Sequence, residues 1–105
     1  MTPKEIFEQK LTASIDKEKA EKIGGTFQFM ITGDDGGEWN IDLTKDADWV
    51  QGGTMDDPKC TVTVSDADWV AIIDGSLNAQ MAFMSGKLKV AGDMSLALKL
   101  QTLLS

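Results

Sequence analysis

Two runs of alternating apolar and polar residues, joined by a glycine-rich turn, constrain the fold of this chain most strongly. The runs are TFQFMIT (26–32) and EWNIDLT (38–44), and GDDGG lies between them. Alternation places every second side chain on the same side of an extended strand. The residues that share the apolar side are Phe27, Phe29, Ile31, Trp39, Ile41 and Leu43. The pattern predicts an antiparallel hairpin with one apolar face that another layer must cover.

The rest of the chain predicts seven further elements around this hairpin. Helices are expected where Ser, Thr, Asp or Asn caps precede apolar residues at helical spacing, and strands where apolar and polar residues alternate. We expect helices at 2–23, 65–74, 78–85 and 93–104, and strands at 47–51, 60–64 and 87–92. The resulting order, α-β-β-β-β-α-α-β-α, is typical of an α+β fold with helices on one face of a mostly antiparallel sheet.

Two details of this arrangement follow from local patterns. The two helices between the fourth and fifth strands form a crossover, which predicts that this pair is parallel and right-handed. The pentapeptide DADWV occurs at 46–50 and again at 66–70. Because only the second copy has a Ser cap and is followed by AII, we expect a strand for the first copy and a helix for the second.

Composition narrows the classes of function. The 105 residues carry a net charge of −7, with ten Lys and no Arg, His or Tyr. The negative net charge and the lack of Arg argue against binding to nucleic acid. The lack of His, Arg and Tyr means that the usual general bases and oxyanion-binding side chains of enzymes are absent. We therefore expect no catalytic residues, no metal and no cofactor, and a single domain over residues 1–105.

The two ends of the sequence, where sorting signals are usually found, carry no such signal, so we expect a cytoplasmic protein. The first ten residues are too charged for a signal peptide, and TLLS at the C-terminus is not a peroxisomal signal. Cys60, which stands alone, cannot form an internal disulfide and fits a reducing compartment. Cys60 also alternates with Val62 and Val64, which predicts a buried and unreactive thiol.

The last predicted helix has more apolar surface than one packing interface requires. Its Leu, Met and Ala side chains fill an arc of roughly 220° when each residue advances about 100°, whereas one surface needs somewhat more than about 100°. Gln101 falls inside this arc. Either two protein surfaces bury the helix, or one part of the arc packs on the sheet while another faces a cavity, with Gln101 as a polar contact for a ligand head group.

Two blocks of sequence resemble a known family. AFMSGKLKVAGDMSLALKLQ (82–101) is similar to the signature of the sterol carrier protein-2 domain family, also called non-specific lipid-transfer domains, and KIGGTFQF (22–29) is similar to its entry into the first strand. The resemblance implies a five-stranded sheet in the order 3-2-1-4-5, helices on one side, and an apolar tunnel between the layers. It also implies non-covalent binding of fatty acids, acyl-CoA, sterols or phospholipids.

The resemblance also implies which residues meet the lipid. By position in the matched blocks and in the looser flanking segments, they are Phe7, Leu11, Trp49, Met81, Met84, Met94, Leu98, Gln101 and Leu104. A fatty acid or other single-chain lipid is the expected ligand, because an acidic chain disfavours the anionic CoA group and lasting membrane contact. We expect a monomer. The alternative is an interaction module that uses the apolar last helix to dimerise or to dock on a lipid-metabolising enzyme.

Overall fold

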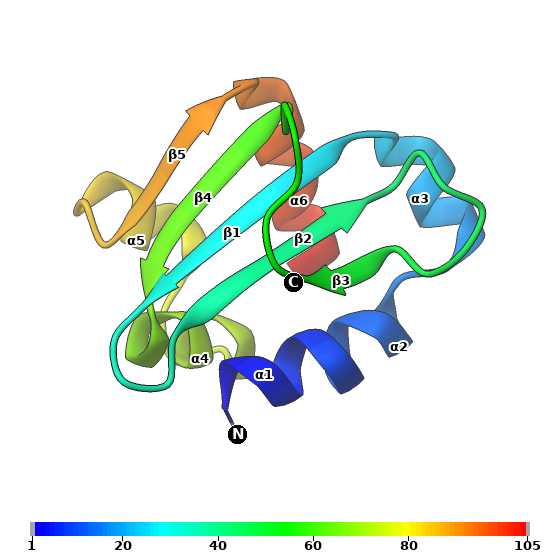
Figure 1. The fold of residues 1–105 in the computed structure, drawn as a ribbon. Helices are drawn as coiled ribbons and strands as arrows, with labels where there is room; N and C mark the ends of the chain where they lie inside the picture. Colours follow the sequence, from blue (N-terminus) through cyan, green and yellow to red (C-terminus); the bar gives the residue numbers. More distant parts are fainter. Residues whose placement is uncertain (1, 105) are drawn as a thin grey trace.

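A computed structural model describes the backbone of residues 2–104 and the side chains of residues 2–99 (Figure 1). The chain begins with three consecutive helical segments, α1, a π-helical segment η1, and α2, and α3 follows after a break. Their bounds are Pro3–Glu5, Ile6–Leu11, Thr12–Ser14 and Lys17–Ile23. The break was not predicted. It occurs because Ile15 is extended and Asp16 starts a new helix, its carboxylate accepting a hydrogen bond from the Lys19 N–H at 2.8 Å.

Five strands form one mixed sheet in the order β3-β2-β1-β4-β5, as the resemblance implied. The strands are β1 (Thr26–Thr32), β2 (Gly37–Asp42), β3 (Val50–Gly52), β4 (Cys60–Ser65) and β5 (Leu88–Gly92). The helices α4 (Asp66–Asp74) and α5 (Ala79–Met84) separate β4 from β5, and α6 (Met94–Leu104) follows β5. The predicted hairpin is present, with Phe29 opposite Trp39.

The predicted strand directions were wrong at one pair. β4 and β5 are antiparallel, and the parallel pair is β1 and β4. Figure 1 shows the reason: α4 and α5 both lie at the end of the sheet where β4 finishes, so the chain re-enters from that same end and β5 runs back along β4. The crossover that makes a parallel pair is instead the path from β1 through β2 and β3 to β4.

Residues 53–59 complete that path by crossing the face of the sheet that α6 does not cover (Figure 1). Gln28 and Asn40, both buried on this face, hold the segment in place. The Gln28 amide donates to the Gly53 carbonyl at 3.2 Å and accepts from the Met55 N–H at 2.8 Å, and the Asn40 amide donates to the same Gly53 carbonyl at 3.0 Å. These bonds satisfy backbone groups that the crossing segment would otherwise leave unpaired.

The repeated pentapeptide adopts two structures, one of which was predicted fully. The second copy is helical throughout and opens α4, where the Ser65 hydroxyl accepts from the Asp68 N–H at 3.2 Å. In the first copy only Val50 belongs to a strand. Asp48 has a positive φ of 54°, and the Trp49 indole donates to the Lys45 carbonyl at 2.8 Å. This turn delays the start of β3 until after Trp49.

Aromatic side chains fill the core beneath the first helices. Phe7 is fully buried, stacked on the rings of Trp39 and Trp69 with both centroid distances at 5.2 Å. The Phe29 ring packs edge-on against the Phe7 ring, with their centroids 5.3 Å apart. The alternation of β1 and the helical spacing of the first segment bring these rings together, and Phe7, Phe29 and Trp69 are fully buried.

Candidate functional site

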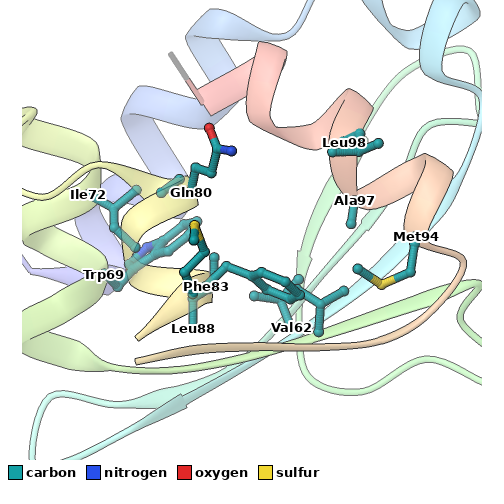
Figure 2. Close-up of a pocket in the computed structure, with 12 residues that line it drawn as sticks. Val62, Trp69, Ile72, Gln80, Phe83, Leu88, Met94, Ala97 and Leu98 are labelled. Carbon is teal, nitrogen blue, oxygen red and sulfur yellow. The ribbon is translucent and has the colours of Figure 1, made fainter. Parts of the chain in front are cut away.

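A pocket of about 390 Å³ lies on the helix-covered side of β4 and β5. We call it the α5–α6 pocket, since α5 and α6 form two of its walls, α4 contributes a third, and the two strands form its floor (Figure 2). Twelve residues line it: Val62, Trp69, Ile72, Ala79, Gln80, Phe83, Met84, Leu88, Val90, Met94, Ala97 and Leu98. The volume falls in the range of about 300–1,000 Å³ that is usual for small-molecule sites.

Strand alternation supplies the floor of the pocket. Val62 pairs with Val90 across β4 and β5, and Leu88 lies two residues earlier on the same face. Because alternate residues point to opposite sides, Lys87 and Lys89 leave this face. The floor is therefore purely aliphatic.

The α5 wall is positioned by a cap and a small buried residue. The Asn78 side chain accepts hydrogen bonds from the N–H groups of Gln80 and Met81, at 2.8 and 3.3 Å, and so starts the helix. Ala82 is fully buried and seats the helix on the core. The lining residues of α5 are two pairs four residues apart, Ala79 with Phe83 and Gln80 with Met84.

The α6 wall divides its apolar residues between two surfaces. Leu96 is buried against Gly25, where a Cβ atom would lie only 2.8 Å from the leucine Cδ1. Met94, Ala97 and Leu98 line the pocket instead, at the i, i+3 and i+4 positions of one helix face. The described part of α6 thus packs on protein on one side and faces a cavity on another, which is the second of the two interpretations of its apolar arc.

The pocket opens to solvent between α5 and α6. We call the exposed large apolar side chains of these helices the α5–α6 rim; with their exposed fractions they are Met81 63%, Phe83 40%, Met84 75%, Met94 46% and Leu98 65%. Trp69 and Ile72, at the inner end, are buried. The pocket therefore has a closed apolar end and an open end whose edge is also apolar.

Three of the nine residues expected to meet a lipid line the pocket: Met84, Met94 and Leu98. Met81 is on α5 but points to solvent outside the lining. Phe7 and Leu11 are buried core residues, and half-buried Trp49 packs against the core from the turn before β3. Gln101 and Leu104 lie outside the residues whose side chains the structure describes, so their predicted contacts remain predictions.

Nine lining residues were not predicted as site residues. Val62, Leu88 and Val90 are apolar residues of alternating strands, and such a pattern gives no signal that a cavity covers part of the strand. Trp69 and Ile72 cluster in α4 like ordinary core residues. Gln80 is the one lining residue with a strongly polar side chain. The only nearby signal was the Asn78 cap, which fixes where the helix begins and therefore the direction of the Gln80 side chain.

The described chemistry of the pocket is that of an apolar container. The indole N–H of Trp69 is buried and has no hydrogen-bond partner among the residues whose side chains are described. Burial, with a smaller contribution from the Asp93 carboxylate, raises the pKa of the Cys60 thiol, which keeps it protonated at neutral pH. No group of three or more His, Cys, Asp or Glu side chains within the described residues is placed to hold a metal ion.

Comparison with protein families and with known proteins finds similarity to sterol carrier and lipid-transfer proteins. Residues 4–105 match the model of the SCP-2 sterol transfer family. Sterol carrier protein 2 of Rattus norvegicus is 41% identical over 90 residues, which are 83% of this chain and 16% of that protein. The chain thus corresponds to a small part of the rat protein. Non-specific lipid-transfer protein-like 1 of Caenorhabditis elegans is 35% identical over 102 residues, which cover 94% of this chain and 86% of the worm protein.

A solved structure has the same fold. The solution NMR structure of palmitated SCP2L2 from Aedes aegypti superimposes with a TM-score of 0.79 and 30% sequence identity, covering 99% of this chain and 95% of the mosquito chain. No helix among the described residues combines the length and apolar character needed to cross a bilayer.

Proposed function

The chain belongs to the SCP-2 sterol transfer family, and we propose that it binds a single-chain lipid such as a fatty acid in the α5–α6 pocket without changing it chemically. The observation that carries the proposal is the lining itself. All twelve lining residues except Gln80 have mainly apolar side chains. The palmitated state of the mosquito relative supports a fatty acid as the ligand class.

Burial of the hydrocarbon chain drives this binding. Each methylene transferred from water contributes about 0.8 kcal/mol, so about ten buried methylenes contribute about 8 kcal/mol before ordering costs. An aliphatic floor offers few directional contacts that separate one chain from another. Met84 and Met94 adapt their shape readily, so we expect broad selectivity among chain lengths.

The shape of the pocket sets the ligand's direction. Trp69 and Ile72 are buried, whereas Gln80, which extends from α5 close to them (Figure 2), is exposed. A polar head at the inner end would lose its water and gain at most one donor, the Trp69 indole N–H. We therefore place the hydrocarbon chain inward and the head group at the opening, within reach of the Gln80 amide.

We include in the proposal that the domain has no catalytic role. The sequence lacks His, Arg and Tyr, and the lining offers no nucleophile and no general base among the described residues. Cys60 is fully buried in β4 and protonated. A carrier that leaves its ligand unchanged needs neither group.

The test is displacement of a fluorescent fatty acid from the purified protein by palmitate. Ala97→Phe fills the pocket from α6 and should lower affinity at least about tenfold, whereas Ala13→Phe, on the exposed face of α2, should change affinity less than about twofold. Circular dichroism and thermal unfolding verify that both variants fold. Equal affinities for the two folded variants would place the ligand elsewhere.

A second candidate function is an interaction module that uses the exposed apolar rim to dimerise or to dock on a lipid-metabolising enzyme. The observation that favours it is the exposure of Met84 and Leu98. Native mass spectrometry separates the two candidates. The carrier proposal expects a monomer that holds co-purified lipid. A ligand-free dimer that takes up no fluorescent fatty acid would support the interaction module.

A further inference from the structure

The methionines of this chain are divided between the two faces of the sheet. Met30 lies in β1 and, by strand alternation, points away from the helices, and Met55 lies in the segment that crosses that same face; both are half-buried. Met81, Met84 and Met94 are exposed and belong to the α5–α6 rim. Within residues 2–99, every exposed methionine therefore lies on the pocket side of the molecule.

Two of the exposed methionines line the pocket from different walls. Met84 is the last residue of α5, and Met94 is the first residue of α6. In Figure 2 the Met94 side chain extends from α6 toward Val62 and Phe83. Met81, one turn earlier on α5 than Met84, does not line the pocket. A chain bound in the pocket would thus cover the thioethers of Met84 and Met94 and leave that of Met81 in water.

An exposed thioether is a site of oxidation by peroxide. Hydrogen peroxide transfers one oxygen to the sulfur, so an S–O bond forms, the O–O bond breaks and the sulfur loses two electrons. The second oxygen leaves as water after it takes the proton of the transferred oxygen. The only thiol of the chain, Cys60, is fully buried, and burial raises its pKa, so it is a poor competitor for the peroxide.

A sulfoxide in the pocket lining opposes binding more than folding. In the empty pocket Met84 and Met94 are exposed, so water hydrates their sulfoxide oxygens and the fold loses little. When a hydrocarbon chain fills the pocket, these oxygens lose that water. The described lining then offers two side-chain donors, the Gln80 amide and the Trp69 indole N–H. Because a polar atom without a partner destabilises the state that buries it, the oxidised protein binds the chain more weakly.

We propose that Met84 and Met94 are sites of reversible oxidation by peroxide that regulate the lipid pocket. Sulfoxide at these two positions lowers fatty-acid affinity, so the oxidised protein releases its chain. A bound chain covers both sulfurs, so the empty protein is oxidised first. Methionine sulfoxide reductases restore the thioethers, which are exposed in the empty protein. The inference rests on the proposed function, because it needs the lipid in the α5–α6 pocket.

The first test compares matched leucine variants before and after treatment with hydrogen peroxide. The lining variant is Met84→Leu with Met94→Leu, and the control variant is Met30→Leu with Met55→Leu on the opposite face of the sheet. Leucine is similar to methionine in volume and has no sulfur to oxidise. Affinity for a fluorescent fatty acid is measured for each protein with and without treatment, and peptide mass spectrometry identifies the oxidised methionines. The change within each protein is compared, so any effect of leucine itself on affinity cancels.

We expect oxidation to lower the affinity of the unmodified protein and of the control variant at least about fivefold, and that of the lining variant less than about twofold. Methionine sulfoxide reductases A and B together should restore the affinity of the unmodified protein, since each reduces one epimer. Circular dichroism should be the same before and after treatment. Equal losses in the two variants, a loss of the folded spectrum, or unchanged affinity with sulfoxide at Met84 and Met94 would each overturn the inference.

The second test is protection by ligand, with Met81 as an internal reference. Palmitate is the probe, because its saturated chain does not react with peroxide. Saturating palmitate should slow oxidation of Met84 and Met94 at least about threefold and change that of Met81 by less than about half, since only Met84 and Met94 line the pocket. Equal rates of slowing at all three positions, or no slowing at Met84 and Met94, would contradict the inference.

Failure of this inference is distinguishable from failure of the proposed function. The displacement assay with Ala97→Phe and Ala13→Phe uses unoxidised protein and tests only where the lipid binds. If the unoxidised protein takes up fatty acid and sulfoxide at Met84 and Met94 leaves the affinity unchanged, the oxidation sites are wrong and the carrier function stands. If the unoxidised protein takes up no fatty acid, the proposed function fails, and the inference fails with it.

Discussion

The two ends of the helix-covered sheet face use apolar side chains in opposite ways. At the α1 end, Phe7 is fully buried between Trp39 and Trp69. At the α6 end, Met84 and Leu98 are 75% and 65% exposed around a pocket of about 390 Å³. Trp69 belongs to both ends, since one face of its surroundings is the aromatic core and the other is the pocket.

The difference shows that apolar periodicity predicts which side chains are removed from water. It does not predict whether other protein atoms or a bound ligand cover them. In the closed end, protein atoms provide the cover, and the gain is stability. In the open end, the same kinds of side chain remain partly in water, and we assign the cover of those that line the pocket to a ligand. The comparison predicts that substitutions at the closed end change folding and that substitutions at the open end change binding.

The largest effect is expected from Phe7→Ala. Removing a fully buried ring from between three aromatic neighbours should lower the free energy of unfolding by about 3–5 kcal/mol. Leu98→Ala is the comparison at the open end and should lower it by less than about 0.5 kcal/mol in ligand-free protein. Denaturant unfolding of both variants measures the difference. Equal losses would show that the open end is as tightly packed as the core.

An intermediate effect is expected from Gln28→Ala, on the uncovered face of the sheet. The change leaves the Met55 N–H and the Trp39 carbonyl without their side-chain partner and loosens residues 53–59. We expect a loss of about 1–3 kcal/mol in the free energy of unfolding and no change in fatty-acid affinity. A tenfold or larger change in affinity would mean that the crossing segment is coupled to the pocket.

The smallest effect on the fold, and the one that sharpens the contrast most, is expected from Leu98→Ser. Exposed in the free protein, this side chain contributes little to folding, but it would become covered when the pocket fills. Fatty-acid affinity should fall about threefold to tenfold, with the unfolding midpoint of ligand-free protein unchanged. Isothermal titration calorimetry and thermal unfolding give the two values. A lower midpoint with unchanged affinity would assign Leu98 to the fold.

Most of the fold was predictable because it depends on local patterns. The alternation around GDDGG predicted the β1–β2 hairpin, and the Ser65 cap predicted α4 within a residue. The direction of β5 was not predictable, because it depends on α4 and α5 folding back on each other at one end of the sheet. The strand expected at 47–51 began late because Asp48 adopts a left-handed conformation that its sequence does not require.

The pocket was less predictable than the fold. Met94 and Leu98 belong to the last helix, which has more apolar surface than one packing interface needs, and the family resemblance assigned them and Met84 to the lipid. Leu11 has the same helical spacing but fills the core, because its helix lies over the closed end. A cavity is a property of how elements are spaced, and neither Val62 nor Trp69 carries a local sign of it.

The central claim, that a hydrocarbon chain occupies the α5–α6 pocket, is tested most directly by quenching with a fatty acid brominated along its chain, since bromine quenches tryptophan only at short range. Trp39→Phe with Trp49→Phe leaves Trp69 in the pocket wall, and Trp39→Phe with Trp69→Phe leaves Trp49 outside it. We predict strong, saturable quenching of Trp69 and little quenching of Trp49. Equal quenching of both, or binding that leaves Trp69 fluorescence unchanged, would contradict the account.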